Sequence, residues 1–164
     1  MIAQQEMPNQ GDSQPTADRM LVEVEHLAVA FGRQVVLREI NIRIRRGETV
    51  AILGESGCGK TVLLKTLVAL QRPTKGRVLF DGQDLFRLRS YELAKQRIRM
   101  GFVFQQAALF DSMTIGENIA FPLRQHTSLS EEEIQTVVRD RLLEVGLPEN
   151  VLRKKPGAIS GGMR

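Results

Sequence analysis

The sequence predicts an α/β protein whose second half is mainly helical, and three observations support this prediction. Residues 49–53 form an apolar run without a polar face, which is typical of a buried parallel strand. A glycine-rich loop and then a helical pattern follow that run directly. From about residue 106 onward the pattern is mainly helical. This order of elements indicates the α/β class with an added helical part.

The residues before the glycine-rich loop predict a tail and three strands. Residues 1–20 are polar, contain two prolines and offer little to bury, so we expect them to be disordered. Alternating apolar side chains predict a strand over 21–31, and residues 35–53 predict two more. Arg46-Gly47 separates the alternating strand from the apolar run that follows it.

The residues after the glycine-rich loop continue the strand–helix pattern. A helix is predicted from Lys60 to about Leu70, because the Arg72-Pro73 pair does not favour helix. The following pattern predicts a strand that turns at Asp81-Gly82, a helix over 90–97 and a strand over 99–104.

The clearest helix is predicted over residues 130–145. Ser130 and Glu133 have the spacing of a capping box, in which each side chain bonds the backbone N–H of the other residue. One apolar face of this helix is predicted to pack on the core; it consists of Ile134, Val137, Val138, Leu142 and Val145.

Composition excludes several classes of protein. No apolar run approaches the roughly 18 residues that a membrane-spanning helix needs, so no transmembrane segment is expected. A single cysteine cannot form an internal disulfide, which fits a reducing cytosol. The net charge is +4, and the aromatic residues, 5% of the chain, do not interleave with the basic groups. We therefore expect no nucleic-acid partner.

The segment GESGCGKT, residues 54–61, fits the phosphate-binding pattern G-x-x-x-x-G-K-[ST] between a strand and a helix. Glycines let the backbone curl so that successive N–H groups point at phosphate oxygens. The Lys60 ammonium would reach the β- and γ-phosphates of a nucleoside triphosphate, and the Thr61 hydroxyl would bind Mg²⁺. The predicted ATP-binding residues of this P-loop are Gly54, Glu55, Ser56, Gly57, Cys58, Gly59, Lys60 and Thr61.

Further motifs give the chain a resemblance to a known family. Residues 159–163, Ile-Ser-Gly-Gly-Met, resemble the LSGGQ signature of ABC transporter ATPases. Residues 102–105 resemble the strand and glutamine of that family's Q-loop, and Phe31 lies where the family has an aromatic that stacks on adenine. The resemblance covers 21–164. It implies a P-loop NTPase core with an N-terminal β-subdomain and an inserted helical subdomain at about 106–160.

The resemblance also implies roles for single residues. Phe31 and Gln105 would contact ATP, and Gln105 would join Thr61 at the Mg²⁺ ion. The signature residues would act in trans, on the ATP of a second, head-to-tail ATP-binding subunit; they are Ser160, Gly161, Gly162 and Met163. The alternatives that stay open are Phe31 as a core aromatic and Gln105 as a loop residue, with Gln106 in its role. Cys58 is interpreted as a filler at a variable loop position rather than as a nucleophile.

Details of the sequence are similar to one branch of the family, the Mce/Mla-type lipid-transport ATPases. These details are the run after the P-loop, the run TIGENIAFPLR, and the methionine in SGGMR. The resemblance implies an ATPase that drives phospholipid transport from the cytoplasmic face of the bacterial inner membrane, bound to a permease subunit. Leu109, Phe110 and Phe121 would contact that permease or, alternatively, form core.

The ABC resemblance further implies residues that this sequence does not contain. In that family an aspartate, a water-activating glutamate and a histidine follow the signature, whereas this sequence stops at Arg164. We therefore expect a C-terminally truncated domain that lacks the later strands, has no complete catalytic set and does not hydrolyse ATP alone. Alternative functions are a non-enzymatic remnant with weak nucleotide binding, or the ATPase of an importer for another small solute.

Overall fold

The computed structural model describes residues 20–105 and 108–163. The chain divides into two compact units, Met1–Met100 and Gly101–Arg164, and each is described by itself. The predicted disordered tail lies outside the described residues, apart from Met20, which begins the first strand.

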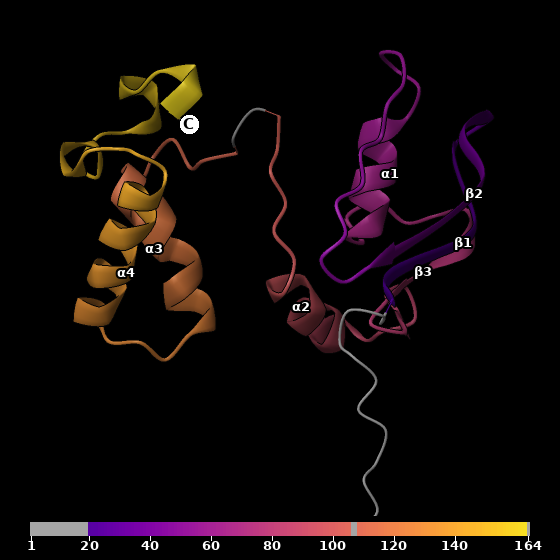
Figure 1. Cartoon of the computed structure of the whole chain (residues 1–164), viewed down its shortest axis with the longest axis horizontal. Coiled ribbons are helices and arrows are strands. Elements are labelled where there is room, and N and C mark those ends of the chain that lie inside the picture. The colour runs from indigo at the N-terminus through magenta and orange to yellow at the C-terminus, as the bar shows by residue number, and fades with distance from the viewer. Residues whose placement is uncertain (1–19, 106–107, 164) are drawn as a thin grey trace, which may run out of the picture. The chain divides into compact units, whose positions relative to one another are not determined.

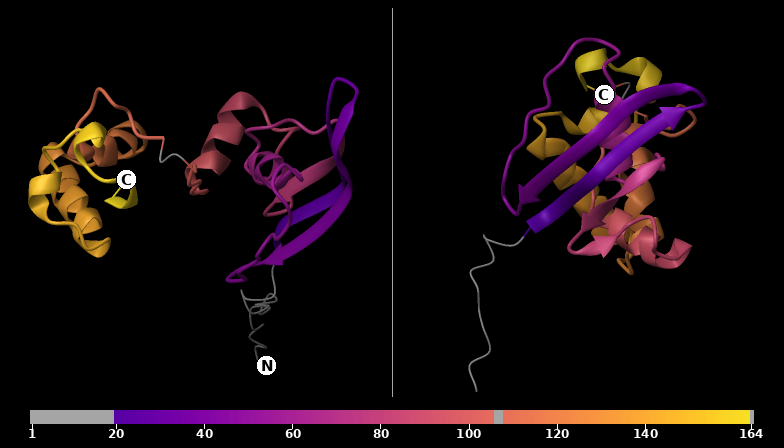
Figure 2. Two further views of the ribbon diagram at one scale, coloured as in Figure 1. Left: turned by 90° about the horizontal axis from the view of Figure 1, so that it is seen from above. Right: turned by 90° about the vertical axis from the view of Figure 1, so that its right-hand side faces the viewer.

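The first unit contains a four-stranded sheet whose neighbours are all antiparallel (Figures 1 and 2). Its strands follow the order β2-β1-β3-β4, with bounds β1 Met20–Phe31, β2 Gln34–Arg45, β3 Lys75–Phe80 and β4 Gln83–Asp84. The long β1–β2 ribbon confirms the first two predicted strands. β3 and β4 form a hairpin at Asp81-Gly82, where both residues have the positive φ that such a tight turn requires.

A bulge at His26 explains why the buried side chains of β1 do not alternate regularly along the sequence. The pairing register shifts between Val24 and Leu27, and His26 itself has a φ of 47°. Because side chains alternate along a strand, the extra residue returns Leu27 and Val29 to the face that already buries Val24. The apolar core of this unit therefore continues along the whole strand.

Two helices complete the first unit, α1 Lys60–Leu67 and α2 Ser90–Ile98. Leu63 of α1 is buried in the core of the sheet unit. The helix ends three residues before the predicted Leu70, because Ala69 adopts a φ of 57° and the N–H of Leu70 bonds the carbonyl of Lys65 instead. The left-handed backbone conformation of Ala69 thus ends α1 before the Arg72-Pro73 pair.

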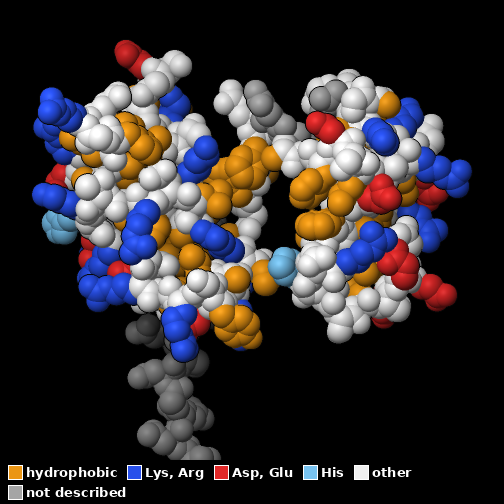
Figure 3. Space-filling model, turned by 180° about the vertical axis from the view of Figure 1, so that it is seen from behind, with side chains coloured by type: hydrophobic (Ala, Val, Ile, Leu, Met, Phe, Trp, Pro, Cys, Tyr) orange, Lys and Arg blue, Asp and Glu red, His pale blue; other side chains and the backbone are white. Residues whose placement is uncertain are grey.

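The predictions of a buried strand at 49–53 and of a strand at 99–104 are wrong for this structure, because both segments lack regular strand structure. Leu53 and Val103 are 91% and 94% exposed. A parallel strand is stabilised by ladder hydrogen bonds to its neighbours, and no described strand pairs with either segment. Exposed hydrophobic side chains are visible on both units in Figure 3.

The second unit is built from two longer helices, α3 Ile115–His126 and α4 Glu131–Glu144 (Figure 1). Three short 3-10 turns follow: η2 Glu149–Val151, η3 Pro156–Ala158 and η4 Gly161–Met163. The predicted capping box of α4 is confirmed, since the Glu133 N–H donates to the Ser130 hydroxyl oxygen.

The predicted apolar face of α4 is confirmed except at its last residue. Ile134, Val138 and Leu142 are buried and Val137 is half-buried. Val145 is 69% exposed and lies just beyond the helix, which ends at Glu144.

Candidate functional site

The glycine-rich segment 54–59 leads directly into α1 and forms an exposed loop. Gly57 has a φ of 81° and Gly59 a φ of 99°, a region that side-chain-bearing residues rarely occupy. These two positions turn the chain back before the helix begins. No side chain caps the N-terminus of α1, so its first amides remain available to an anion.

Gly59 is required for space as well as for its backbone angle. A Cβ atom at this position would lie 2.9 Å from the Cγ1 of Val36 and 3.0 Å from the Cδ2 of Leu37. Both of these residues belong to β2. The sheet therefore sets the place where the loop becomes a helix, and it does so through a close contact that only glycine allows.

The Lys60 ammonium lies over the loop. Its Nζ donates to the carbonyl oxygens of Gly54 at 2.7 Å and Glu55 at 2.6 Å, and lies 3.7 Å from the Sγ of Cys58. The positive charge is thus held beside the loop backbone and the N-terminus of α1. A phosphate that enters the loop would meet this charge without a large rearrangement of the backbone.

The Thr61 side chain is suited to contribute one oxygen to a magnesium ion. Thr61 is exposed in the first turn of α1, and no described residue bonds its hydroxyl. Within the described ranges no group of three or more His, Cys, Asp or Glu side chains forms a metal site. A magnesium ion at this loop would take most of its ligands from water and phosphate, as Mg²⁺ commonly does.

Phe31 lies at the tip of the β1–β2 hairpin, where it pairs with Gln34. Its side chain is 49% exposed, so the alternative of a core aromatic is wrong. Gln34 is two residues from Val36, the contact of Gly59, which corresponds to roughly 7 Å along a strand. An exposed aromatic side chain and the glycine-rich loop consequently lie at the same end of the hairpin.

The other predicted site residues belong to the second unit. Gln105 is exposed and described, whereas its alternative Gln106 lies outside the described residues. Ser160, Gly161 and Gly162 form an exposed segment at η4. Met163 is half-buried and packs against the apolar cluster around Ile115 and Leu142. The predicted signature segment is therefore exposed at Ser160, Gly161 and Gly162 and packed at Met163.

Asp81 anchors the segment that leads to the P-loop. Its carboxylate accepts hydrogen bonds from Arg46, just after β2, and from Arg99, just after α2. The Arg99 hydrogen bond, and then that of Arg46, hold the pKa of Asp81 below its usual value. The start of the segment that leads to the P-loop and the start of the segment after α2 are thereby tied to the β3–β4 turn.

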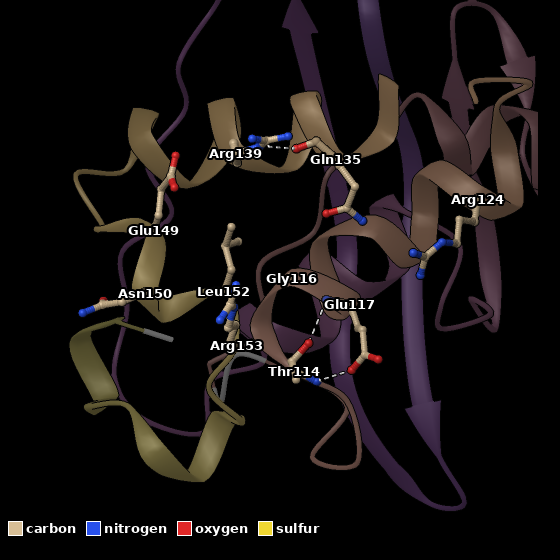
Figure 4. Close-up of a pocket in the computed structure, with 10 residues that line it drawn as sticks. All are labelled: Thr114, Gly116, Glu117, Arg124, Gln135, Arg139, Glu149, Asn150, Leu152 and Arg153. Carbon is tan, nitrogen blue, oxygen red and sulfur yellow. Dashed lines mark hydrogen bonds between the residues drawn. The ribbon is translucent and has the colours of Figure 1, made fainter. Parts of the chain in front are cut away.

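A hollow of about 630 Å³ in the second unit contains none of the predicted site residues (Figure 4). Glutamate and arginine side chains mix along its wall. Glu117 accepts from the Thr114 N–H at 2.7 Å to cap α3, and the Arg139 Nε donates to the Gln135 carbonyl at 3.2 Å. Because several of its polar groups bond one another, this hollow is a poor candidate for the nucleotide site.

Comparison with known proteins decides the family. The sequence matches the description of the ABC transporter family over residues 37–164, which include the P-loop and the signature-like segment. This chain belongs to the ABC transporter family.

Curated relatives of this ABC-family chain include ATP-binding proteins of several transport systems. It is 43% identical over 143 residues to the probable ribonucleotide transport ATP-binding protein of Mycobacterium leprae, covering 87% of this chain and 41% of that one. It is 42% identical to the intermembrane phospholipid transport ATP-binding protein MlaF of Haemophilus influenzae, covering 87% of this chain and 54% of MlaF. The chain therefore spans about half or less of these relatives.

Solved structures show the same fold. A dimeric ATP-binding cassette in a post-hydrolysis state, bound to ADP and Pi, matches with a TM-score of 0.80 and 33% identity. The match covers 87% of this chain and 65% of that cassette. The predicted α/β cassette fold of the ABC family is confirmed. In the part of the chain that the structure describes, no helix has the length and apolarity of a membrane span.

Two features of the P-loop were missed by the analysis of the sequence. One is the contact of Gly59 with Val36 and Leu37, which the spacing of the motif does not reveal. The other is the pair of backbone carbonyls that hold the Lys60 ammonium. The Gly59 contact depends on β2, which is distant in the sequence, and the carbonyls have no signal in the residue types because every position has one.

Proposed function

We propose that this chain binds ATP at residues 54–61 and forms the ATP-binding part of an ABC-type ATPase that powers transport. The observation that carries this proposal is the position of the Lys60 ammonium, held by two loop carbonyls beside the uncapped N-terminus of α1. A cation, free amides and a helix N-terminus together favour the phosphates of a nucleotide. The ADP-bound relative of the same fold supports the same ligand class.

Each part of the loop has a separate task in this proposal. Backbone N–H groups between Gly54 and Thr61 donate to phosphate oxygens, and the glycines let the backbone approach closely. Lys60 transfers its ammonium from the carbonyls of Gly54 and Glu55 to the β- and γ-phosphates. Phe31, half-exposed at the hairpin tip, stacks on the adenine ring.

Magnesium completes the proposed site. When bound, Mg²⁺ would neutralise developing charge on the β- and γ-phosphate oxygens. We propose that the Thr61 hydroxyl and the Gln105 side chain hold it. Ser56 and Cys58 contribute to the site through their backbone amides, so we assign no chemical step to the Cys58 thiol.

The proposed assembly contains a second ATP-binding subunit and a permease. Ser160, Gly161, Gly162 and Met163 would contact the ATP of the second subunit, with the two subunits arranged head to tail. Residues from about 106 to 160 would form the inserted helical subdomain. The dimeric state of the structural relative supports pairing of this kind. The complex would lie at the cytoplasmic face of a bacterial inner membrane.

The Phe110–Phe121 pair is the proposed contact with the permease. Their rings lie 5.1 Å apart and are 50% and 37% exposed. The Phe110 N–H donates to the Asn118 side-chain oxygen at 2.8 Å, which ties this loop to α3. Leu109, in contrast, packs half-buried on the core of the second unit, so we assign it to packing.

The proposed cargo is phospholipid, moved across or between bacterial membranes, and the similarity to MlaF supports it. A second candidate is an importer for another small solute. The chain is also 42% identical over 148 residues to the sulfate/thiosulfate import ATP-binding protein of Caulobacter vibrioides. Transport of labelled phospholipid and of labelled sulfate by the reconstituted complex separates the two candidates.

Titration calorimetry with MgATP tests the nucleotide site directly. Lys60→Ala removes charged hydrogen bonds to phosphate, and such bonds contribute about 1.5–3 kcal/mol each. We expect Kd to rise roughly 10- to 100-fold. Lys65→Ala, on the same helix, is the matched control and should bind as wild type does. Equal affinity in wild type and Lys60→Ala would contradict the assignment of the P-loop.

A further inference from the structure

The first unit contains a second concave site, away from the P-loop. This hollow, of about 460 Å³, lies where the loop after α1 enters β3, beside the bulge of β1 and the edge strand β4. The glycine-rich residues 54–59 of the P-loop precede Lys60, at the start of α1, whereas the hollow begins at Arg72, beyond the end of the helix at Leu67. The helix alone separates them by roughly 12 Å.

The wall of the hollow carries more positive than negative charge. Its two acidic side chains are already bound by arginines of the same wall. The Arg77 Nε donates to Glu25 at 2.5 Å, and the Arg87 Nε lies 3.4 Å from the Asp84 carboxylate. The charges within each of these two pairs cancel, so the pairs add no net charge to the site.

Two further cations of the wall have no acidic partner among the described residues. Arg72 makes one long contact, from Nη2 to the carbonyl of Phe86 at 3.5 Å, and the Lys75 ammonium has no hydrogen bond or ion pair. The lining residue His26 is bonded to Glu39 outside the hollow, so it is not counted in this surplus. Arg72 and Lys75 therefore give the hollow a surplus of two positive charges.

The backbone between these two cations is held firmly on β1. The Thr74 N–H donates to the Ala28 carbonyl at 2.8 Å, and the Thr74 hydroxyl accepts from the Ala30 N–H at 2.9 Å. Gly76 approaches β1 so closely that a Cβ would lie 2.4 Å from the carbonyl oxygens of Glu25 and His26. The cations thus project from a preorganised loop, which lowers the cost of binding.

We propose that this hollow binds a phosphate group, with Arg72 and Lys75 as its cationic ligands. A guanidinium can donate two parallel hydrogen bonds to a phosphate, and an ammonium adds a mobile point charge. The hollow lies within the size range of small-molecule sites, and its open, polar wall suits a charged head rather than an acyl chain. The phosphate belongs either to a soluble ester or to a phospholipid headgroup.

The first test is an amide-shift titration of the isotope-labelled 164-residue chain with glycerol 3-phosphate. Sodium chloride at equal ionic strength serves as the reference. We expect saturable shifts at residues 72–77 that persist in Lys60→Ala, which separates this site from the P-loop. The double variant Arg72→Gln/Lys75→Gln should bind at least tenfold more weakly. Its matched control, Arg33→Gln/Arg38→Gln, exchanges two exposed arginines of the β1–β2 hairpin and should bind as wild type does.

A second test identifies the source of the phosphate. Sedimentation with phosphatidylglycerol vesicles, compared with phosphatidylcholine vesicles, reports headgroup binding. Vesicle binding that Arg72→Gln/Lys75→Gln abolishes assigns the site to lipid, and saturable binding of glycerol 3-phosphate without vesicle binding assigns it to a soluble ester. The absence of saturable shifts at 72–77 together with no vesicle binding overturns the proposal. Identical binding by the double variant and wild type also overturns it.

Discussion

Single glycines occupy turns and close contacts in the first unit. A comparison of Gly76 with Gly82 distinguishes the effect of backbone strain from that of steric crowding. Gly76 and Gly82 both have a positive φ, 79° and 74°. A Cβ at Gly82 would meet nothing within 4 Å, whereas a Cβ at Gly76 would lie 2.4 Å from two carbonyl oxygens of β1. The same substitution therefore adds strain at one site and strain plus collision at the other.

We expect Gly82→Ala to lower the free energy of unfolding by about 1–2 kcal/mol, the cost of a left-handed alanine. Gly76→Ala should lower the free energy of unfolding by about 1–3 kcal/mol more than Gly82→Ala does, because the new methyl group collides with backbone that cannot move aside. Urea unfolding of both variants measures the difference. Equal decreases in the free energy of unfolding would show that β1 moves at the His26 bulge to make room for the methyl group.

At the scale of elements, the second unit depends on helix ends and on the pairing of α3 with α4. Ser130 caps α4, as Thr114 caps α3, and each accepts from the backbone N–H three residues later. Arg124 of α3 donates to Glu131 of α4, with its Nε at 3.1 Å. Caps satisfy amides that the helix itself leaves unpaired, so each cap has a measurable effect on stability.

Ser130→Ala should destabilise the protein by about 1 kcal/mol, the usual effect of losing an N-cap side chain. Ser128→Ala, two residues earlier in the exposed connection, is the control and should be neutral. Chemical unfolding followed by circular dichroism provides the measurement. A neutral Ser130→Ala would mean that another group or water replaces the cap.

The Arg124–Glu131 contact also predicts a pH dependence. The hydrogen bond from Arg124, and then that from Gln135, lower the pKa of Glu131 from 4.5 to about 2. A depressed pKa means that the contribution is present above pH 4.5 and is lost as the pH falls toward about 2. Wild type should be more stable than Glu131→Gln above that range, and the two should converge at its lower end. Both side chains are exposed, so added salt should reduce the difference.

At the scale of the whole molecule, each unit has its own apolar core, yet both expose large apolar side chains. The core of the first unit is built around Leu27, Val29 and Val78, and the second around Ile115 and Leu142. Leu53 and Val103, both almost fully exposed, lie in the two segments, 49–53 and 99–104, that the sequence predicts as strands. Exposed apolar surface of this kind favours association with other molecules.

The 164-residue chain studied alone is therefore expected to bind a hydrophobic dye such as ANS. The double variant Leu53→Ser/Val103→Ser should bind less dye and remain folded, because both side chains already face water. Leu27→Ser places a hydroxyl in the core and should increase dye binding through partial unfolding. Unchanged fluorescence in the double variant would show that other surface carries the dye.

Local patterns in the sequence determined much of this protein. Alternation predicted β1 and β2, the Asp81-Gly82 pair predicted the β3–β4 turn, and Ser130 with Glu133 predicted the start of α4. Each of these depends on neighbours within a few residues of the chain. The P-loop motif belongs to this group, since its spacing and the helix after it are local as well.

Only the tertiary structure decided features that depend on distant segments. Apolar composition predicted strands at 49–53 and 99–104, but a strand needs a partner for its ladder, and composition does not supply one. The bulge at His26 was hidden because its register shift is defined only against β2 and β3. The charge surplus at Arg72 and Lys75 was missed because it appears only once Arg77 and Arg87 are paired with Glu25 and Asp84. Local propensity depends on the residues of one segment of the chain. Strand pairing, burial and charge balance depend on contacts between at least two segments, so one segment alone does not determine them.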